Sequence, residues 1–358
     1  MPNFNGELLL LARQYRERSQ ADVATEAGLD QGHYSRIERG LLNSEPSEET
    51  ISKIAKALDF PVDFFFQDIE LSGLPLSVHG PAWRKRATTL ASDIKRLHAE
   101  LNIRAFHLKE LLNSLEFDAD LPLPELDVDE CGGAAAAARL VRRAWSIPDS
   151  PIRSLTSYCE RAGILVAHCD FPEKVDGVTM RVRGLPPCIF LNRSAPADRM
   201  RHSLAHELGH IVLHRIPTDD MEKEADVFAS ELLAPFKLVS AELIGGRVTL
   251  HRLVQQKMYW RVSVASLLYK LGENGFLTSN QAGYLWRQLS AKGWKTQEPE
   301  ETQFAREKTN LYEHVIALHI EELKYSKADM KKLLRSNGRD LEVLYSIEKE
   351  KSHLRVVK

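Results

Sequence analysis

The chain of 358 residues has few cysteines, no long apolar run and little net charge. Its four cysteines, at positions 131, 159, 169 and 188, form no CxxC pair. This indicates reduced thiols rather than a disulfide framework or a thiolate metal site. No stretch is long enough to span a bilayer, and the apolar run from Leu8 has neither a basic segment before it nor a small-residue cleavage site after it. We expect a cytoplasmic protein with no membrane partner.

The net charge of -2 neither suggests nor excludes a polyanionic partner. The apolar share of 43% and the charged share of 27% are typical of a globular protein that buries real cores. The sequence predicts a mainly α, multidomain fold. The expected ranges are a helical bundle at 1–70, a basic helical connector with an acidic, proline-containing linker at 71–130, an α+β domain with a small sheet at 131–272, and a helical C-terminal region at 273–358.

The N-terminal range alternates short helical patterns with breaks. Asp30 and Ser47 are plausible N-caps, and Gly28 and Gly40 are plausible stops. The pattern predicts a bundle of five short helices. Further along, three β-type segments, at 163–170, 175–184 and 187–194, are bounded by glycine or proline and predict a small sheet. From about residue 247 onward the pattern is helical.

Four histidines follow the last β-type segment at a strict four-residue spacing: His202, His206, His210 and His214. On a helix, such residues lie nearly above one another. The middle pair belongs to an HExxH motif with Glu207. Two imidazoles one turn apart reach a single Zn²⁺, and the glutamate, about 100° round the helix, takes a proton from water without binding the metal.

A third protein ligand is needed, and the segment "MEKEAD" supplies one. Glu222 lies twelve residues after His210, and Asp226 follows one turn later. One of these carboxylates is expected to bind the metal while the other accepts an N–H from a ligating histidine. Glu224 is the competing ligand, but it points about 200° away from Glu222, so both cannot face the metal.

The alternative to a zinc site is a buried helix that binds no metal, because the HExxH pattern also occurs by chance. The apolar context, the preceding strands and the acidic second helix favour zinc. For His202 and His214 the balance is reversed, because a third or fourth imidazole is surplus to the site; both are interpreted as packing or surface residues.

The stretches "RHSLAHELGHIVLH" and "EKEADVFASELLAP" resemble the ImmA/IrrE family of zinc metallopeptidases. The resemblance implies a zincin-like fold, a gluzincin-like metalloendopeptidase, His206, His210 and Glu222 as zinc ligands, and Glu207 as the catalytic base. Asp226 matches the residue four after the third ligand, where it would lie in the second shell. The ending "LLAP" has Ala234 where the family usually has methionine.

The segment "PPCIFLNRS" also resembles that family's strand before the active helix, and by analogy with other metallopeptidases we expect it to be an edge strand that pairs with a protein or peptide substrate. The residue that supports the oxyanion is left open among His202, Tyr259 and Arg261.

The stretch "SQADVATEAGLDQGHYSRIERG" resembles the helix-turn-helix of the XRE, lambda-repressor-like regulators. The resemblance implies that Gln20 and Gln31 open the two motif helices and contact double-stranded operator DNA. Residues at the N-terminal end of the second helix reach base edges. The expected DNA contacts are therefore Gln20, Gln31, Gly32, His33 and Arg36, although Gly32 replaces the usual Ser or Thr.

Charge opposes this interpretation. Residues 1–70 hold seven Lys or Arg against thirteen Asp or Glu, which gives 7 − 13 = −6, whereas DNA affinity depends largely on neutralising phosphates. Arg13, Arg16 and Arg18, together with Arg36 and Arg39, offer a local basic face, and the "WRKR" stretch at 83–86 adds charge beyond the bundle. We expect DNA binding as a homodimer, because one such bundle covers a half-site.

The two resemblances together match regulators that join an XRE domain to an ImmA/IrrE domain. They imply a DNA-binding transcriptional regulator whose zinc-dependent peptidase cleaves itself or a partner, of repressor or antitoxin type, in a stress, prophage or toxin–antitoxin setting. The alternative is a non-proteolytic regulator in which the zinc domain is structural or sensory. A third possibility is a protein-interaction scaffold that ignores DNA.

Overall fold

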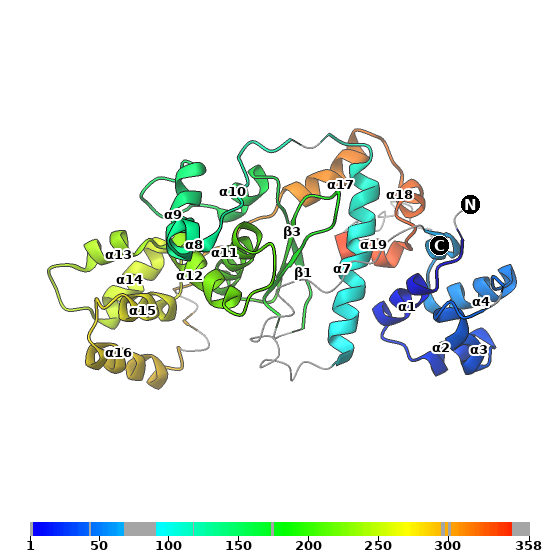
Figure 1. Cartoon of the computed structure of the whole chain (residues 1–358), viewed down its shortest axis with the longest axis horizontal. Helices are drawn as coiled ribbons and strands as arrows, with labels where there is room; N and C mark the ends of the chain where they lie inside the picture. Colours follow the sequence, from blue (N-terminus) through cyan, green and yellow to red (C-terminus); the bar gives the residue numbers. More distant parts are fainter. Residues whose placement is uncertain are drawn as a thin grey trace, which may run out of the picture. The chain divides into compact units, whose positions relative to one another are not determined.

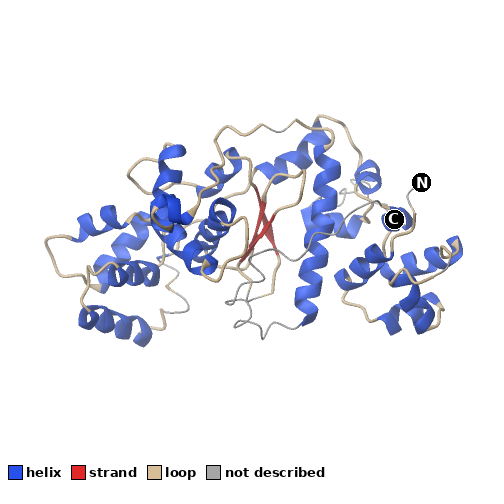
Figure 2. Ribbon diagram, in the orientation of Figure 1, coloured by secondary structure: helices blue, strands red, loops and turns tan. Residues whose placement is uncertain are grey.

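The computed structural model describes residues 3–42, 44–67, 91–116, 118–172, 175–294, 298–299 and 302–345. The described chain is mainly α-helical with one small mixed sheet, as the sequence predicts. Figure 1 shows the course of the chain, and Figure 2 distinguishes its helices from the three strands. The stretch at 83–86 and the first part of the expected connector, 71–90, lie outside the described residues. Among the described residues, no helix combines the length and the apolar character that crossing a membrane requires.

The chain forms two compact units, 1–74 with 89–116 and 313–358, and 75–88 with 117–312. These units cut across the expected domain ranges, because the helices after 312 belong to the N-terminal unit. The expected boundaries remain predictions. The helices of the first unit are α1 (Gly6–Tyr15), α2 (Gln20–Ala27), α3 (Gln31–Glu38), α4 (Glu48–Leu58), the 3-10 helix η1 (Val62–Phe66), α7 (Ala91–Leu112), α18 (Lys327–Leu333) and α19 (Gly338–Tyr345).

The expected five-helix bundle comprises α1 to α4 and η1, and its helices begin and end where local chemistry dictates. The Asp30 side chain accepts from the backbone N–H of His33 at the start of α3, and Ser47 caps α4 in the same way. Gly28 ends α2 with a φ of 67°, the left-handed conformation that glycine adopts without strain. The turn between α2 and α3 is therefore set by sequence-local interactions.

The core of this unit extends beyond the bundle. Apolar side chains of α1 to η1 pack with Ala99, Ile103 and Phe106 of α7 and with Leu344 of α19. Arg16, the C-cap of α1, makes two hydrogen bonds of 2.7 Å with the carboxylate of Asp340 on α19, and the Asp340 side chain is 4% exposed. Helix α19, more than 270 residues further along the chain, thus completes the packing of the N-terminal bundle.

The second unit contains α8 (Val128–Cys131), α9 (Ala134–Ala144), α10 (Leu155–Arg161), α11 (Ala197–Leu213), α12 (Met221–Leu233), α13 (Phe236–Leu243), α14 (Leu250–Trp260), α15 (Val264–Glu273) and α16 (Ser279–Ala291). Helix α17 (Leu311–Glu321) starts in this unit and continues into the first. The helical pattern expected from 247 onward breaks at 302–310, which contain no α-helix. There Glu307 accepts from the backbone N–H of Thr156 at 2.7 Å and pairs with Arg201, so ionic contacts with the unit replace helical hydrogen bonds.

The sheet has the strand order β1–β3–β2. Strand β1 (Leu165–Cys169) runs parallel to β3 (Cys188–Asn192), and β2 (Gly177–Met180) runs antiparallel to it. Helix α11 packs on β2 and β3, while α12 lies against α11 and α9. The analogy that made the 187–194 segment an edge strand is wrong, because β3 is paired on both sides. Strand β2, which lies against Glu207 of α11, is an edge strand of the sheet instead.

We predict that Arg16→Met destabilises the N-terminal unit by about 3 kcal/mol, because it leaves the buried Asp340 carboxylate without its partner. Hydrogen–deuterium exchange of peptides from α1 and α19 in the full chain is expected to accelerate on the order of 100-fold. Lys53→Ala, which removes an exposed ion pair with Glu49, serves as the control and is expected to change stability by less than about 0.5 kcal/mol. Equal exchange in wild type and Arg16→Met would contradict this role.

Candidate metal centre and helix-turn-helix surface

The histidine stripe lies on α11, and α12 packs directly against it (Figure 1). Gly209 permits this contact: a Cβ at this position would lie 3.2 Å from Cα of Ala225 and 3.2 Å from the Phe228 ring. Two helices that meet at such a small residue approach closely, and side chains next to the contact on each helix can reach the other. Three carboxylates near the start of α12, Glu222, Glu224 and Asp226, come within reach of α11 in this way.

The structure brings His206, His210 and Glu222 together. One ligand atom from each lies within 4.8 Å of the other two. The two Nε2 atoms are 3.1 Å apart, and they lie 3.6 Å and 3.5 Å from the Glu222 carboxylate oxygens. Three ligands of a tetrahedral ion at about 2.0–2.1 Å would be roughly 3.4 Å from one another. The three predicted ligands therefore have the spacing that a Zn²⁺ ion requires.

Two observations indicate that the group fits a cation. Glu222 Oε1 and Glu207 Oε2 are buried without a hydrogen-bond partner, and such orphaned carboxylate oxygens are costly. Two imidazole lone pairs 3.1 Å apart also repel each other unless a proton or a cation lies between them. Burial lowers the pKa of His206, but hydrogen bonds with Asp226 and Glu222 outweigh it and raise that pKa to about 10. The carboxylates thus favour a positive charge at this point.

Glu207 is 4% exposed and packs between α11 and β2. A Cβ at Gly177 on β2 would lie 3.2 Å from Cγ of Glu207, a tight contact that glycine avoids. Burial raises the pKa of Glu207, which makes its carboxylate a better proton acceptor than an exposed glutamate. Its side chain is not one of the metal-binding group but lines the same cleft. A carboxylate beside the metal-binding group but outside it is placed to accept a proton from a water molecule in the cleft.

Each histidine ring of the pair has a partner on its other nitrogen. His206 Nδ1 lies 2.8 Å from Asp226 Oδ1, which is the arrangement predicted for Asp226. His210 Nδ1 lies 2.9 Å from Nδ1 of His214. His214 Nε2 in turn lies 3.0 Å from Glu224 Oε2. Neither contact is predicted by the sequence, which suggests Glu224 as a competing metal ligand and His214 as a packing or surface residue, although the unbroken four-residue spacing already aligns His214 with His210.

His206, Glu207 and Glu222 line a cleft of about 1000 Å³. The apolar side chains of Val227, Tyr269 and Trp294 line the same cleft. Of the three residues considered for stabilising the oxyanion, His202 lines this cleft within the described part of the chain. Tyr259 and Arg261 are elsewhere, and Arg261 donates to the Arg153 carbonyl. Burial lowers the pKa of His202, so its imidazole is neutral near pH 7.

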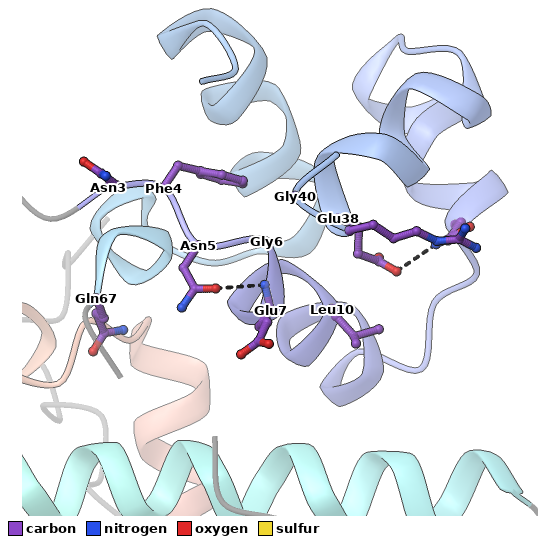
Figure 3. Close-up of a pocket in the computed structure, with 11 residues that line it drawn as sticks. Asn3, Phe4, Asn5, Gly6, Glu7, Leu10, Glu38, Gly40 and Gln67 are labelled. Atoms are coloured by element: carbon purple, nitrogen blue, oxygen red, sulfur yellow. Dashed lines mark hydrogen bonds between the residues drawn. The ribbon is translucent and has the colours of Figure 1, made fainter. Parts of the chain in front are cut away.

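In the N-terminal unit, the predicted DNA contacts Gln31, Gly32 and Arg36 are exposed, and His33 is half-buried. Gln20 differs, because its side-chain amide donates to the buried carboxylate of Glu38 at 2.7 Å. Both residues line a hollow beside the start of α1 (Figure 3). The negative charge in that hollow is already compensated, since Arg13 also donates twice to Glu38.

The expected basic face is smaller than the sequence suggests. Arg13, Arg16 and Arg18 are engaged in ion pairs with Glu38, Asp340 and Glu26. Arg36 and Arg39 are exposed, and for neither does the described structure show a salt bridge. Of these five arginines, the two for which the described structure shows no salt bridge therefore lie on α3 and its C-cap.

Two family models match separate parts of the chain. Residues 159–272 match the peptidase family described as the IrrE N-terminal-like domain, and residues 11–65 match the helix-turn-helix family. The first match contains all residues of the metal-binding group together with Glu207 and Asp226. The second contains α2 and α3 with the turn between them. No curated protein matches the chain in a sequence comparison.

We predict that the full chain binds one zinc ion. His210→Ala and Glu222→Ala are each expected to weaken zinc affinity more than about 100-fold, because each removes a direct ligand. Metal analysis after gel filtration and competition with a chromogenic chelator measure the stoichiometry and the affinity. His202→Ala is the matched control on the same stripe and should retain zinc. A wild-type chain without stoichiometric metal would refute the site.

Proposed function

We propose that this chain, which joins a helix-turn-helix domain to an IrrE N-terminal-like peptidase domain, is a DNA-binding regulator that cleaves itself or a partner protein at a zinc site. The observation that carries the proposal is the position of Glu207. A buried carboxylate with an unpartnered oxygen lies beside two histidines and a third ligand, where a purely structural metal site has no need of one.

In this proposal His206, His210 and Glu222 hold the metal, and Asp226 orients the His206 ring. A divalent ion held there would supply Lewis-acid chemistry, polarising the scissile carbonyl and lowering the pKa of the attacking water. Glu207 accepts the proton of the attacking water and delivers it to the leaving amine. His202 faces the cleft as a neutral imidazole whose N–H is available to the developing oxyanion.

The substrate is proposed to be an extended segment of a protein. Val227, Tyr269 and Trp294 offer apolar contacts along the cleft that a small polar metabolite has no use for. A repressor or antitoxin, or the chain's own DNA-binding part, fits the pairing of a peptidase domain with a helix-turn-helix domain. A stress, prophage or toxin–antitoxin setting is part of the same proposal.

Glu207→Gln is expected to keep zinc and to lower cleavage about 10²–10⁴-fold, because the isosteric amide cannot accept the proton. The measurement is mass spectrometry of new peptide termini in zinc-loaded protein incubated with the products of neighbouring genes. Glu130→Gln removes an exposed charge on α8, outside the cleft-lining residues, and serves as the control. If the zinc-loaded wild type leaves itself and these partners intact under every inducing stress, the domain is structural or sensory instead.

For the helix-turn-helix domain we propose that Gln31, Gly32, His33 and Arg36 face the major groove, with Gln20 near the phosphates. The exposure of Gln31, Gly32 and Arg36 on α3 supports this proposal. Binding as a homodimer to a palindromic operator is part of the same proposal, because a single bundle covers one half-site.

Arg36→Ala is expected to weaken binding to the promoter of the chain's own operon by about 1–3 kcal/mol, since Arg36 is an exposed cation of α3. Fluorescence anisotropy at several salt concentrations measures both affinity and its salt dependence. Lys332→Ala, an equal charge change on α18, is the control. A mobility shift that is absent or independent of salt would favour a role in protein contacts.

A further inference from the structure

Each of the two ligating histidines is hydrogen-bonded through its Nδ1 atom, but His206 reaches a carboxylate directly and His210 reaches one only through a second histidine. His206 contacts the Asp226 carboxylate directly, at 2.8 Å. His210 contacts His214 at 2.9 Å between the two Nδ1 atoms, and His214 contacts Glu224 at 3.0 Å through Nε2. The His214 side chain is 2% exposed, so its two nitrogens must find these partners within the protein.

The donor and the acceptor of each hydrogen bond between His210, His214 and Glu224 follow from the Glu224 carboxylate. A carboxylate accepts hydrogen bonds and donates none, so His214 donates to Glu224 from Nε2. In the neutral His214 ring, Nδ1 then carries the lone pair and acts as acceptor. The Nδ1 of His210 is therefore the donor between the two rings. His210 is left with its lone pair on Nε2, the atom that faces His206 Nε2 and Glu222.

The opposite tautomers are excluded by the same contact. If His210 accepted at Nδ1, His214 would donate there and present a lone pair from Nε2 to the Glu224 carboxylate. Two acceptors 3.0 Å apart repel each other. Glu224 thus selects the tautomer of a ring that it does not touch.

We propose that His214 and Glu224 are positioning residues that fix the tautomer and orientation of His210, so that its Nε2 lone pair is presented to the metal. This inference rests on the proposed zinc site. It gives the two ligating histidines equivalent support from α12, directly from Asp226 for one ring and through His214 from Glu224 for the other. The support for His210 is an indirect relay, because His214, one helical turn further along, lies between His210 and Glu224.

A role in packing alone makes a different prediction. Any side chain of similar volume at position 214 would then serve, and the charge of Glu224 would be irrelevant to the metal. The positioning role requires both an acceptor at 214 and a carboxylate behind it. The two possibilities are separated by metal affinity and by the protonated nitrogen of His210, neither of which depends on peptidase activity.

The first experiment measures zinc affinity of the full chain by chelator competition, together with the visible spectrum of the Co²⁺-substituted protein. Glu224→Gln and His214→Leu are each expected to weaken affinity about 10–100-fold and to alter the Co²⁺ bands. Asp226→Asn is the matched variant on the other ring and should have an effect of similar size. Glu273→Gln controls for the loss of one negative charge in the cleft and should leave affinity unchanged.

His214→Gln distinguishes hydrogen bonding from shape. Its amide can accept from His210 and donate to Glu224, so it should recover at least part of the affinity that His214→Leu loses. Wild-type affinity and an unchanged Co²⁺ spectrum in both Glu224→Gln and His214→Leu would overturn the proposal. Circular dichroism of each variant establishes that it is folded.

The second experiment determines the tautomers without metal. Long-range ¹⁵N–¹H correlations of histidine-labelled full chain are expected to show His210 protonated at Nδ1 and His214 at Nε2. A His210 ring protonated at Nε2 alone would overturn the relay. If the wild type bound no zinc, the proposed peptidase would fail whatever the tautomers; if it bound zinc and the relay variants matched it, the relay alone would fail.

Discussion

The close approach of α11 and α12 is the constraint on which the candidate site depends. Gly209 lies where the two helices touch, and a Cβ there would be 3.2 Å from Cα of Ala225. At this separation, the carboxylates of Glu222, Glu224 and Asp226 reach three consecutive rings of the histidine stripe. A wider spacing would leave the histidines on one helix and the carboxylates on another, with motifs intact in the sequence and no group able to hold an ion.

Burial makes the same arrangement chemically useful. Charged groups in a dry environment interact more strongly than in water and are costly when left unpaired. Glu207 is buried and Glu222 is largely buried beside two imidazoles whose Nε2 atoms face each other, while Asp226 is exposed and contacts the other side of the His206 ring. A cation relieves this imbalance, and the carboxylate that does not belong to the metal-binding group remains as a proton acceptor. We therefore propose that burial of these carboxylates serves both functions, because it favours a bound cation at Glu222 and raises the proton affinity of Glu207.

The N-terminal unit shows a second dependence between distant parts of the chain. The helix-turn-helix bundle shares its core with α7 and α19, and Arg16 is bound to Asp340 near the other end of the sequence. Intramolecular ion pairs also reduce the positive charge available to DNA, because Arg13, Arg16 and Arg18 each contact a carboxylate. Of the five arginines considered for DNA, Arg36 and Arg39 on α3 and its C-cap stay exposed.

The sequence alone determined the local features: helix caps at Asp30 and Ser47, the turn at Gly28, and the HExxH spacing that aligns His206 with His210. These are short-range properties, because periodicity and capping act within one or two helical turns. Only the tertiary structure decided that β3 is central, that α19 joins the N-terminal core, and that His214 connects His210 to Glu224. Each of these depends on which segments meet in space, and residues far apart in the chain carry no local signal of their contact. The stripe of four histidines was visible in the sequence, but the roles of its outer members were set by what packs against them.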